Sequence, residues 1–122
     1  MVYTIIVADD HQTWRETQVG EIQDAFPDVR VDMVETREEL VGRVLSGDYS
    51  VVVSDNDMEN PNDGLEALRA IRSAGNNVPF YLWSARNIGD EAISSGANGF
   101  YKKDQFATEF EMMVEEITQY LE

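Results

Sequence analysis

The chain has 122 residues, no cysteine and a formal net charge of −15, from 24 acidic and 9 basic residues. A chain of this length has room for one core, so we expect a single domain over residues 1–122, without an output domain. The lack of cysteine excludes disulfide bonds and thiolate metal sites, and the acidity argues against direct binding of nucleic acid, which requires a basic surface.

Strand-like and helix-like segments alternate along the chain. In order they are a strand at 2–8, a helix at 12–26, a strand at 29–34, a helix from Thr36, a strand at 50–54, a helix at 64–74, a strand at 79–83, a short helix between Ser84 and Gly96, a strand at 99–101 and a last helix from Thr108. This alternation predicts an α/β fold with a doubly wound, five-stranded parallel sheet and helices on both faces. Ligands of such folds bind at the carboxyl ends of the strands.

The predicted strands are of two kinds. Residues 2–8, 50–54 and 79–83 are almost purely apolar, which indicates strands buried on both faces of a parallel sheet. Residues 29–34 alternate between apolar and polar positions, which is typical of a partly exposed edge strand with Met33 on the buried side.

Start and stop signals bound the predicted helices. Thr36 and Glu39 form a capping box, and Thr108 introduces the last helix. Gly47 and Gly75 would end the second and third helices. The sequence contains neither a basic leader nor an apolar run long enough to span a bilayer, which predicts a cytoplasmic protein without membrane attachment.

Polar residues follow the predicted strands where their carboxyl ends meet. They are Asp9 and Asp10 after the first strand, Asp55 after the third, Ser84 after the fourth and Lys103 after the fifth. Three carboxylates at one edge repel one another unless a cation lies between them, and Mg²⁺ binds through a few carboxylates and phosphoryl oxygens. The ion, an ammonium and a hydroxyl together suit phosphoryl transfer to a carboxylate.

Four motifs resemble those of the receiver domains of response regulators. In chain order they are IIVADDH at 5–11, VVVSDNDM at 51–58, LWSAR at 82–86 and GANGFYKKD at 96–104. Each motif alone is weak, but four in order at near-family spacing are strong, and they cover the whole chain. The resemblance implies a flavodoxin-like sheet with strand order 2-1-3-4-5. It also implies a phosphorelay function, in which the phosphoryl donor is a histidine kinase or a histidine phosphotransfer protein.

The resemblance assigns the acceptor and the metal ligands. Asp55 would accept the phosphoryl group in a Mg²⁺-dependent reaction and would itself bind the metal. Asp10 would be a direct ligand, Asp9 a ligand mostly through water, and the backbone carbonyl of Asp57 a further ligand. His11 follows the acidic pair, but a loop position of this kind is more often peripheral.

The resemblance also implies a conformational switch. Ser84 would bind a phosphoryl oxygen, Lys103 would pair with Asp55, and Phe100 would turn inward when Ser84 moves. Spacing selects Lys103 as the functional lysine and leaves Lys102 as its solvent-facing neighbour. A downstream protein target would read the change, with the chain as a monomer or a weak phosphorylation-dependent dimer.

One departure from the family pattern concerns the output face. The stretch from Ser84 to Gly96 is roughly three residues short, so the fourth helix would lose most of a turn. Because this helix forms much of the family's output face, partner recognition would be unusual.

Asp57 and Arg86 each lie two residues beyond a site residue, and in the family such positions border the path of the hydrolytic water. Asp57 could repel that water, orient it, or pair with Arg86 and block access. The pair would thereby set the lifetime of the phosphoryl group.

Two alternative functions remain open. Asp55-Asn56-Asp57 is an Asp-x-Asp motif, as in metal-dependent phosphatases of the haloacid dehalogenase type that form an aspartyl phosphate. In those enzymes the motif precedes the acidic pair, whereas here it follows Asp9 and Asp10. The second alternative is a receiver-like module that binds proteins without being phosphorylated. The receiver interpretation predicts no turnover enzyme, only single-turnover self-phosphorylation and slow autodephosphorylation.

Overall fold

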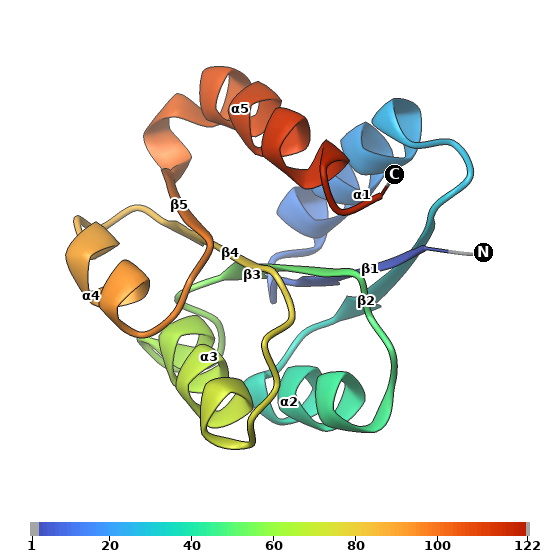
Figure 1. Cartoon of the computed structure of the whole chain (residues 1–122). Coiled ribbons are helices and arrows are strands. Elements are labelled where there is room, and N and C mark those ends of the chain that lie inside the picture. The colour runs from blue at the N-terminus through green and yellow to red at the C-terminus, as the bar shows by residue number, and fades with distance from the viewer. Residues whose placement is uncertain (1–2, 122) are drawn as a thin grey trace.

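The computed structural model describes residues 3–121 as a parallel sheet between two layers of helices (Figure 1). The elements are β1 (Thr4–Ala8), α1 (Gln12–Ala25), β2 (Arg30–Val34), α2 (Arg37–Ser46), β3 (Val51–Asp55), α3 (Asp63–Ser73), β4 (Phe80–Ser84), α4 (Gly89–Ser94), β5 (Gly99–Lys102), the 3₁₀ turn η1 (Lys103–Gln105) and α5 (Phe106–Thr118). All strands are parallel, in the order β2-β1-β3-β4-β5. The predicted doubly wound, flavodoxin-like fold is therefore confirmed.

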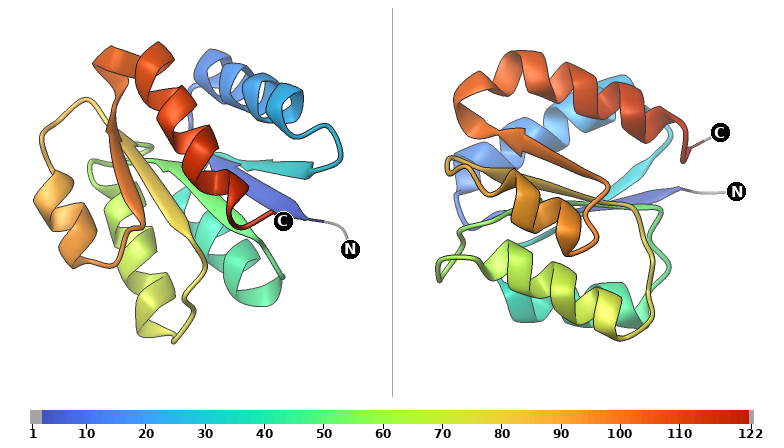
Figure 2. Two further views of the ribbon diagram at one scale, coloured as in Figure 1. Left: turned by 45° about the horizontal axis from the view of Figure 1, so that its top comes forward. Right: turned by 60° about the vertical axis from the view of Figure 1, so that its left-hand side comes forward.

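The sheet separates two apolar cores. Helices α1 and α5 cover one face, α2 and α3 cover the other, and the short α4 lies beside β5 at the edge (Figure 2). The central strands β1, β3 and β4 are buried along their whole length, as their apolar runs predicted. None of the helices described is long and apolar enough to cross a membrane.

The edge strand β2 differs from its prediction at one residue. Met33 was expected on the buried side, but it is 48% exposed, whereas its neighbour Val34 is buried. An edge strand has a partner on one side only, so a residue on its covered face can still reach solvent. The alternation of β2 is thus weaker than its sequence suggests.

Two helix ends follow local rules. The Thr36 hydroxyl accepts the Glu39 amide at 3.1 Å, which confirms the predicted capping box of α2. Gly75 adopts φ +82°, and its amide donates to the Arg72 carbonyl, which ends α3 in the left-handed conformation that glycine favours.

The short fourth helix is confirmed, since α4 has six residues. The start of the last helix is wrong in the prediction: α5 begins at Phe106 rather than at Thr108. The reason is that η1 leads from Lys103 directly into the helix, so no separate capping residue is needed at the predicted place.

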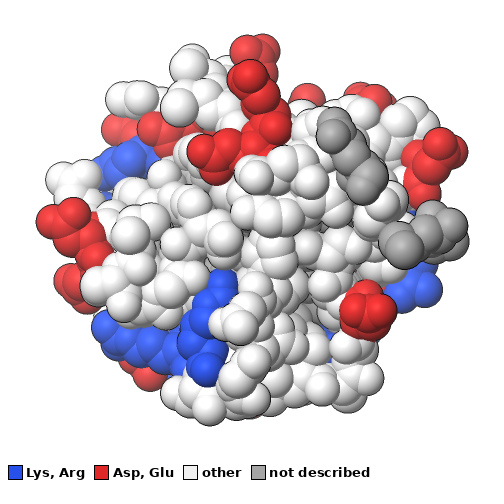
Figure 3. All heavy atoms as spheres, in the orientation of Figure 1, with Lys and Arg blue, Asp and Glu red and all other residues white. Residues whose placement is uncertain are grey.

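Acidic side chains are spread over the face drawn in Figure 3 and do not gather in one patch. This distribution agrees with the net charge of −15. Three acids, Asp9, Asp10 and Asp55, lie at the carboxyl ends of β1 and β3, and two of them, Asp9 and Asp55, are buried.

Candidate functional site

Three carboxylates meet at the carboxyl edge of the sheet. Asp9 and Asp10 follow β1, Asp55 is the last residue of β3, and one carboxylate oxygen from each lies within 4.8 Å of the others. Asp9 and Asp55 are 0% and 4% exposed, whereas Asp10 is exposed. The donor set consists only of carboxylate oxygens, which is the kind of ligand that Mg²⁺ takes. The residues present therefore fit a magnesium ion.

Hydrogen bonds to both carboxylate oxygens and to the backbone hold Asp9 in place. Its Oδ1 accepts the His11 amide at 2.9 Å, and its Oδ2 accepts a hydrogen bond from Gln18 Nε2 at 3.1 Å. Its backbone amide donates to the Val34 carbonyl, and its own carbonyl accepts from Arg15 Nη1. Of the acidic pair, Asp9 is thus the fixed member and the exposed Asp10 the more accessible one.

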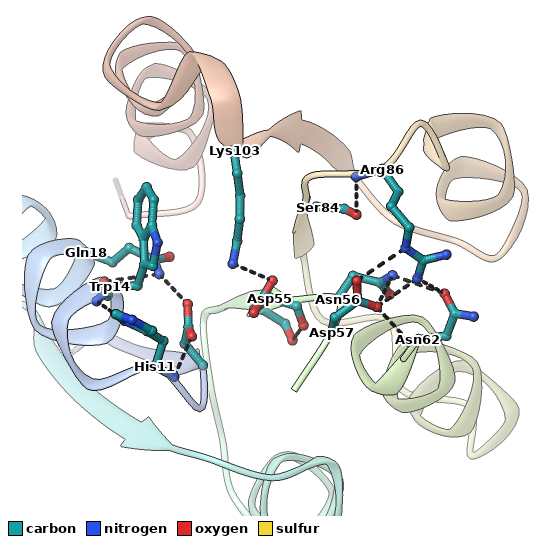
Figure 4. Close-up of polar contacts among 12 residues, drawn as sticks. His11, Trp14, Gln18, Asp55, Asn56, Asp57, Asn62, Ser84, Arg86 and Lys103 are labelled. Atoms are coloured by element: carbon teal, nitrogen blue, oxygen red, sulfur yellow. Dashed lines mark hydrogen bonds and ion pairs between the residues drawn. The ribbon is translucent and has the colours of Figure 1, made fainter. Parts of the chain in front are cut away.

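Lys103 is the cation of the site. Its Nζ lies 2.9 Å from Asp55 Oδ1, in an ion pair whose side chains are 21% and 5% exposed (Figure 4). The ammonium also lies 5.5 Å from the centre of the Trp14 ring, a cation–π distance. Trp14 in turn packs edge-on against Phe106, with ring centres 4.7 Å apart. The Trp14 ring, supported by Phe106, therefore lies beside the ammonium that pairs with Asp55.

Burial and charge together perturb the acids. Burial raises the pKa of Asp55 to about 6, although the hydrogen bond and the charge of Lys103 oppose the rise. The neighbouring carboxylates of Asp9 and Asp10 raise it further. Burial also raises the pKa of Asp9. A single lysine does not compensate this concentration of negative charge, and a cation bound among the three acids would.

Ser84 is the last residue of β4, the strand next to β3, and so lies at the same edge of the sheet as Asp55. It is 1% exposed, and its Oγ accepts the Arg86 amide at 2.9 Å. The hydroxyl still has its own proton to donate, so it can bind an oxygen of an incoming anion. Because this hydrogen bond belongs to the loop that follows β4, any movement of Ser84 is coupled to that loop.

Asp57 and Arg86 form an ion pair beside the cluster. Arg86 Nη2 donates to Asp57 Oδ1 at 2.7 Å and Arg86 Nε to Oδ2 at 3.2 Å. Asn62 also binds both residues. Its side-chain oxygen accepts a hydrogen bond from Arg86 Nη2 at 2.7 Å, and its backbone amide donates to Asp57 Oδ1 at 2.9 Å. The hydrogen bond from Arg86 lowers the pKa of Asp57. In Figure 4 the Asp57 side chain points toward Arg86 and Asn62 rather than toward Lys103.

Lys102, expected as the solvent-facing neighbour of Lys103, is partly exposed but also makes specific hydrogen bonds. Its Nζ donates to the Ala85 carbonyl at 3.0 Å and to Asn87 Oδ1 at 2.7 Å. The loop after β4 is therefore tied on one side to β5 through Lys102 and on the other to Asp57 through Arg86.

Phe100 lies on β5, half-buried against the core on the side of α2 and α3. A Cβ built on Gly89 would lie 3.1 Å from its ring, so the ring lies against the first turn of α4. Its inward movement stays a prediction, as does the metal-ligand role of the Asp57 carbonyl.

Two residues that contact the site were not assigned to it from the sequence. Gln18 binds Asp9, and Trp14 covers Lys103. The signal was available, because Trp14, Gln18 and Ile22 follow one another at four-residue spacing and so share a face of α1. A polar residue on an otherwise buried apolar face marks a specific hydrogen bond.

Known proteins share this fold. The family model of the response regulator receiver domain matches residues 5–115. The receiver domain of the Francisella response regulator 1452 is 18% identical, with 98% of this chain and 99% of that chain covered and a TM-score of 0.84. Response regulator TrrA from Thermotoga maritima, solved in complex with Mg²⁺ and BeF, is 25% identical, with 94% and 98% covered and a TM-score of 0.80.

Among curated protein sequences, none matches this chain. The family model, however, spans nearly the whole chain, and the solved structures share its topology over almost their full length. These findings, together with the acidic cluster, lead to one assignment: the chain belongs to the response regulator receiver domains, the signalling modules of two-component systems.

Proposed function

We propose that the chain accepts a phosphoryl group on Asp55 in a Mg²⁺-dependent reaction and thereby switches its binding to a protein target. The donor would be a histidine kinase or a histidine phosphotransfer protein. One observation carries the proposal: a buried Asp55 lies 2.9 Å from Lys103 and within reach of the Asp9 and Asp10 carboxylates.

The chemistry follows from where these groups lie. An Asp55 oxygen would attack phosphorus in line with the leaving nitrogen of a phosphohistidine, so that a P–O bond forms as the P–N bond breaks. Asp9, Asp10, Asp55 and the Asp57 carbonyl would hold Mg²⁺. The bound ion would supply positive charge to the phosphoryl oxygens. Lys103 would neutralise a further oxygen. The complex of TrrA with Mg²⁺ and BeF supports this assignment for a relative that is 25% identical.

The switch would run through the loop after β4. A new phosphoryl oxygen would draw the Ser84 hydroxyl inward, and the Arg86 amide that now donates to it would move with the loop. Phe100 would then turn inward beside Gly89 at the start of α4. A partner that binds one arrangement better shifts the population toward it.

The decisive test is labelling with acetyl phosphate and Mg²⁺, followed by intact mass measurement. We expect one phosphoryl group per chain, lost in Asp55→Asn. The matched control is Asp48→Asn, because Asp48 is an exposed acid near the opposite end of the same strand. Unchanged labelling of Asp55→Asn would contradict the proposal.

The same preparation separates the alternatives. Many cycles of hydrolysis of a generic phosphomonoester per chain would instead indicate a metal-dependent phosphatase. Wild-type protein that binds Mg²⁺ but takes no label from acetyl phosphate or from phosphohistidine donors would indicate a receiver-like module that acts without phosphorylation.

A further inference from the structure

Gln18 is a buried polar residue in the middle of α1. Gln18 is only 2% exposed, and it shares its helix face with Ile22, which is fully buried. Its Nε2 donates to Asp9 Oδ2 at 3.1 Å and to the Trp14 carbonyl at 3.3 Å. Among the described residues, its Oε1 is the buried side-chain polar atom that has no hydrogen-bond partner.

The orientation of this amide is set by its neighbours. Both partners of Nε2, the Asp9 carboxylate and the Trp14 carbonyl, are acceptors only. Turning the amide over would place Oε1 against two acceptors, so the orientation with Nε2 toward Asp9 is the favourable one. Figure 4 shows the Gln18 amide directed toward the candidate site from behind the Trp14 ring.

A buried acceptor without a partner costs stability, and an apolar residue of similar length would avoid that cost. What glutamine provides at this position is an N–H directed at a buried carboxylate. The opposite Asp9 oxygen is fixed at 2.9 Å by the His11 amide. The two donors together determine the plane of the Asp9 carboxylate, and so the direction of its remaining lone pairs.

We propose that Gln18 is a positioning residue of the metal site, which acts through Asp9. By fixing the carboxylate plane it presents Asp9 to an ion shared with Asp10 and Asp55, whose oxygens lie within 4.8 Å of one another. The inference rests on the magnesium site of the proposed function. Partners that orient metal ligands contribute strongly to affinity, and their loss costs about 10- to 100-fold.

The first test is Mg²⁺ affinity, measured by calorimetry without any phosphoryl donor. Gln18→Met keeps the length of the side chain and removes both amide atoms, and we expect about tenfold weaker binding. Gln18→Leu serves as a second apolar variant if the first folds poorly. The matched control is Ile22→Val, one turn further along the same face of α1, which should lower stability and leave Mg²⁺ affinity unchanged.

A spectroscopic readout distinguishes positioning from packing. The side-chain NH₂ signals of Gln18 should shift during a Mg²⁺ titration with the same dissociation constant as calorimetry gives, because the acceptor Asp9 binds the ion. The exposed Gln23, on the same helix, provides the control signal and should not shift. A Gln18 signal that stays constant through saturation would overturn the proposal.

A double-mutant comparison tests the route of the effect. In an Asp9→Asn background, Gln18→Met should cost no further affinity, and an equal loss in both backgrounds would contradict action through Asp9. Failure of this inference is separable from failure of the proposed function. If wild type binds Mg²⁺ and takes label on Asp55, and Gln18→Met binds Mg²⁺ equally well, only the role of Gln18 is overturned. If wild type binds no Mg²⁺, both the role of Gln18 and the proposed function are overturned.

Discussion

The Lys103 ammonium lies 2.9 Å from Asp55 Oδ1, and the side chain of Asp55 is only 5% exposed. This one cation faces three acids, since Asp9 and Asp10 meet Asp55 at the same edge. The site therefore holds excess negative charge, which makes Asp55 sensitive both to pH and to cations.

The first prediction concerns pH. The pKa of Asp55 rises from its ordinary value of 3.8 to about 6, chiefly through burial, so the folded state favours the protonated acid. The stability that this group contributes is present below the ordinary pKa and is lost as the pH rises through about 6. Relative to Asp55→Asn, metal-free wild type should therefore lose up to roughly 3 kcal/mol of unfolding free energy between about pH 4 and about pH 7.

The measurement is urea denaturation of both proteins with a chelator present, over this pH range. Comparison with Asp55→Asn removes the contributions of other acids, such as Asp57, whose lowered pKa acts in the opposite direction. A stability difference between the two proteins that stays constant with pH would contradict the prediction.

The second prediction concerns metal removal. Mg²⁺ at about 100 times its dissociation constant should stabilise the folded chain by about 2.7 kcal/mol, because the ion binds only the assembled cluster. Asp10→Ala should remove most of this gain, and without metal it should be at least as stable as wild type, since one repelling charge is gone. Thermal melts with and without Mg²⁺ measure both effects, and an equal Mg²⁺ shift in Asp10→Ala would exclude Asp10 as a ligand.

Much of the site was predictable because strand patterns place it. The apolar runs identify buried parallel strands, and the residues after such strands meet at one edge. This reasoning brings Asp9, Asp10 and Asp55 together and places Lys103 beside them, as the structure shows. No tertiary detail was needed for these positions.

Contacts that depend on the path of a loop were not predictable. Lys102 and Lys103 are consecutive, and sequence spacing selects only Lys103 as functional. That Lys102 reaches Ala85 and Asn87 depends on how the loop after β4 runs into a six-residue helix. The early start of α5 at Phe106 has a similar origin, because a 3₁₀ turn is a local adjustment that periodicity does not reveal.

The third prediction concerns the lifetime of the phosphoryl group. Arg86 bridges Asp57 and Asn62 beside the site, with the Asp57 side chain 43% exposed. Asp57→Asn removes the charge that holds Arg86 and should shorten the phosphoryl lifetime severalfold by opening the path of water. Stability should fall by less than about 1 kcal/mol, because exposed ion pairs contribute little.

Decay of the label after removal of acetyl phosphate provides the rate. Glu59→Gln is the control, because it neutralises an exposed acid in the same loop. Identical decay in wild type and Asp57→Asn would exclude a role of the ion pair in hydrolysis.

The fourth prediction concerns the tie between β5 and the loop after β4. Lys102 donates to the Ala85 carbonyl and to Asn87, while the Arg86 amide donates to Ser84 Oγ. Lys102→Met keeps the aliphatic stem and removes both hydrogen bonds, so the loop should open more often. Each hydrogen bond contributes about 0.5–1.5 kcal/mol, so loss of both should accelerate amide exchange by about 5- to 100-fold at Arg86 and at Ile88, whose amide donates to the Arg86 carbonyl.

The control for this prediction is a cation at the other end of α4. Arg69→Met removes a guanidinium that binds Ser95 Oγ at 3.1 Å, and it should leave exchange at Arg86 unchanged. Faster exchange in Lys102→Met alone, with amides of β3 unaffected, would identify Lys102 as a restraint on the loop that carries Ser84. Because any inward movement of Ser84 must then overcome this restraint, Lys102→Met should also bind a beryllofluoride phosphoryl mimic more tightly than wild type, and equal or weaker binding would contradict that coupling.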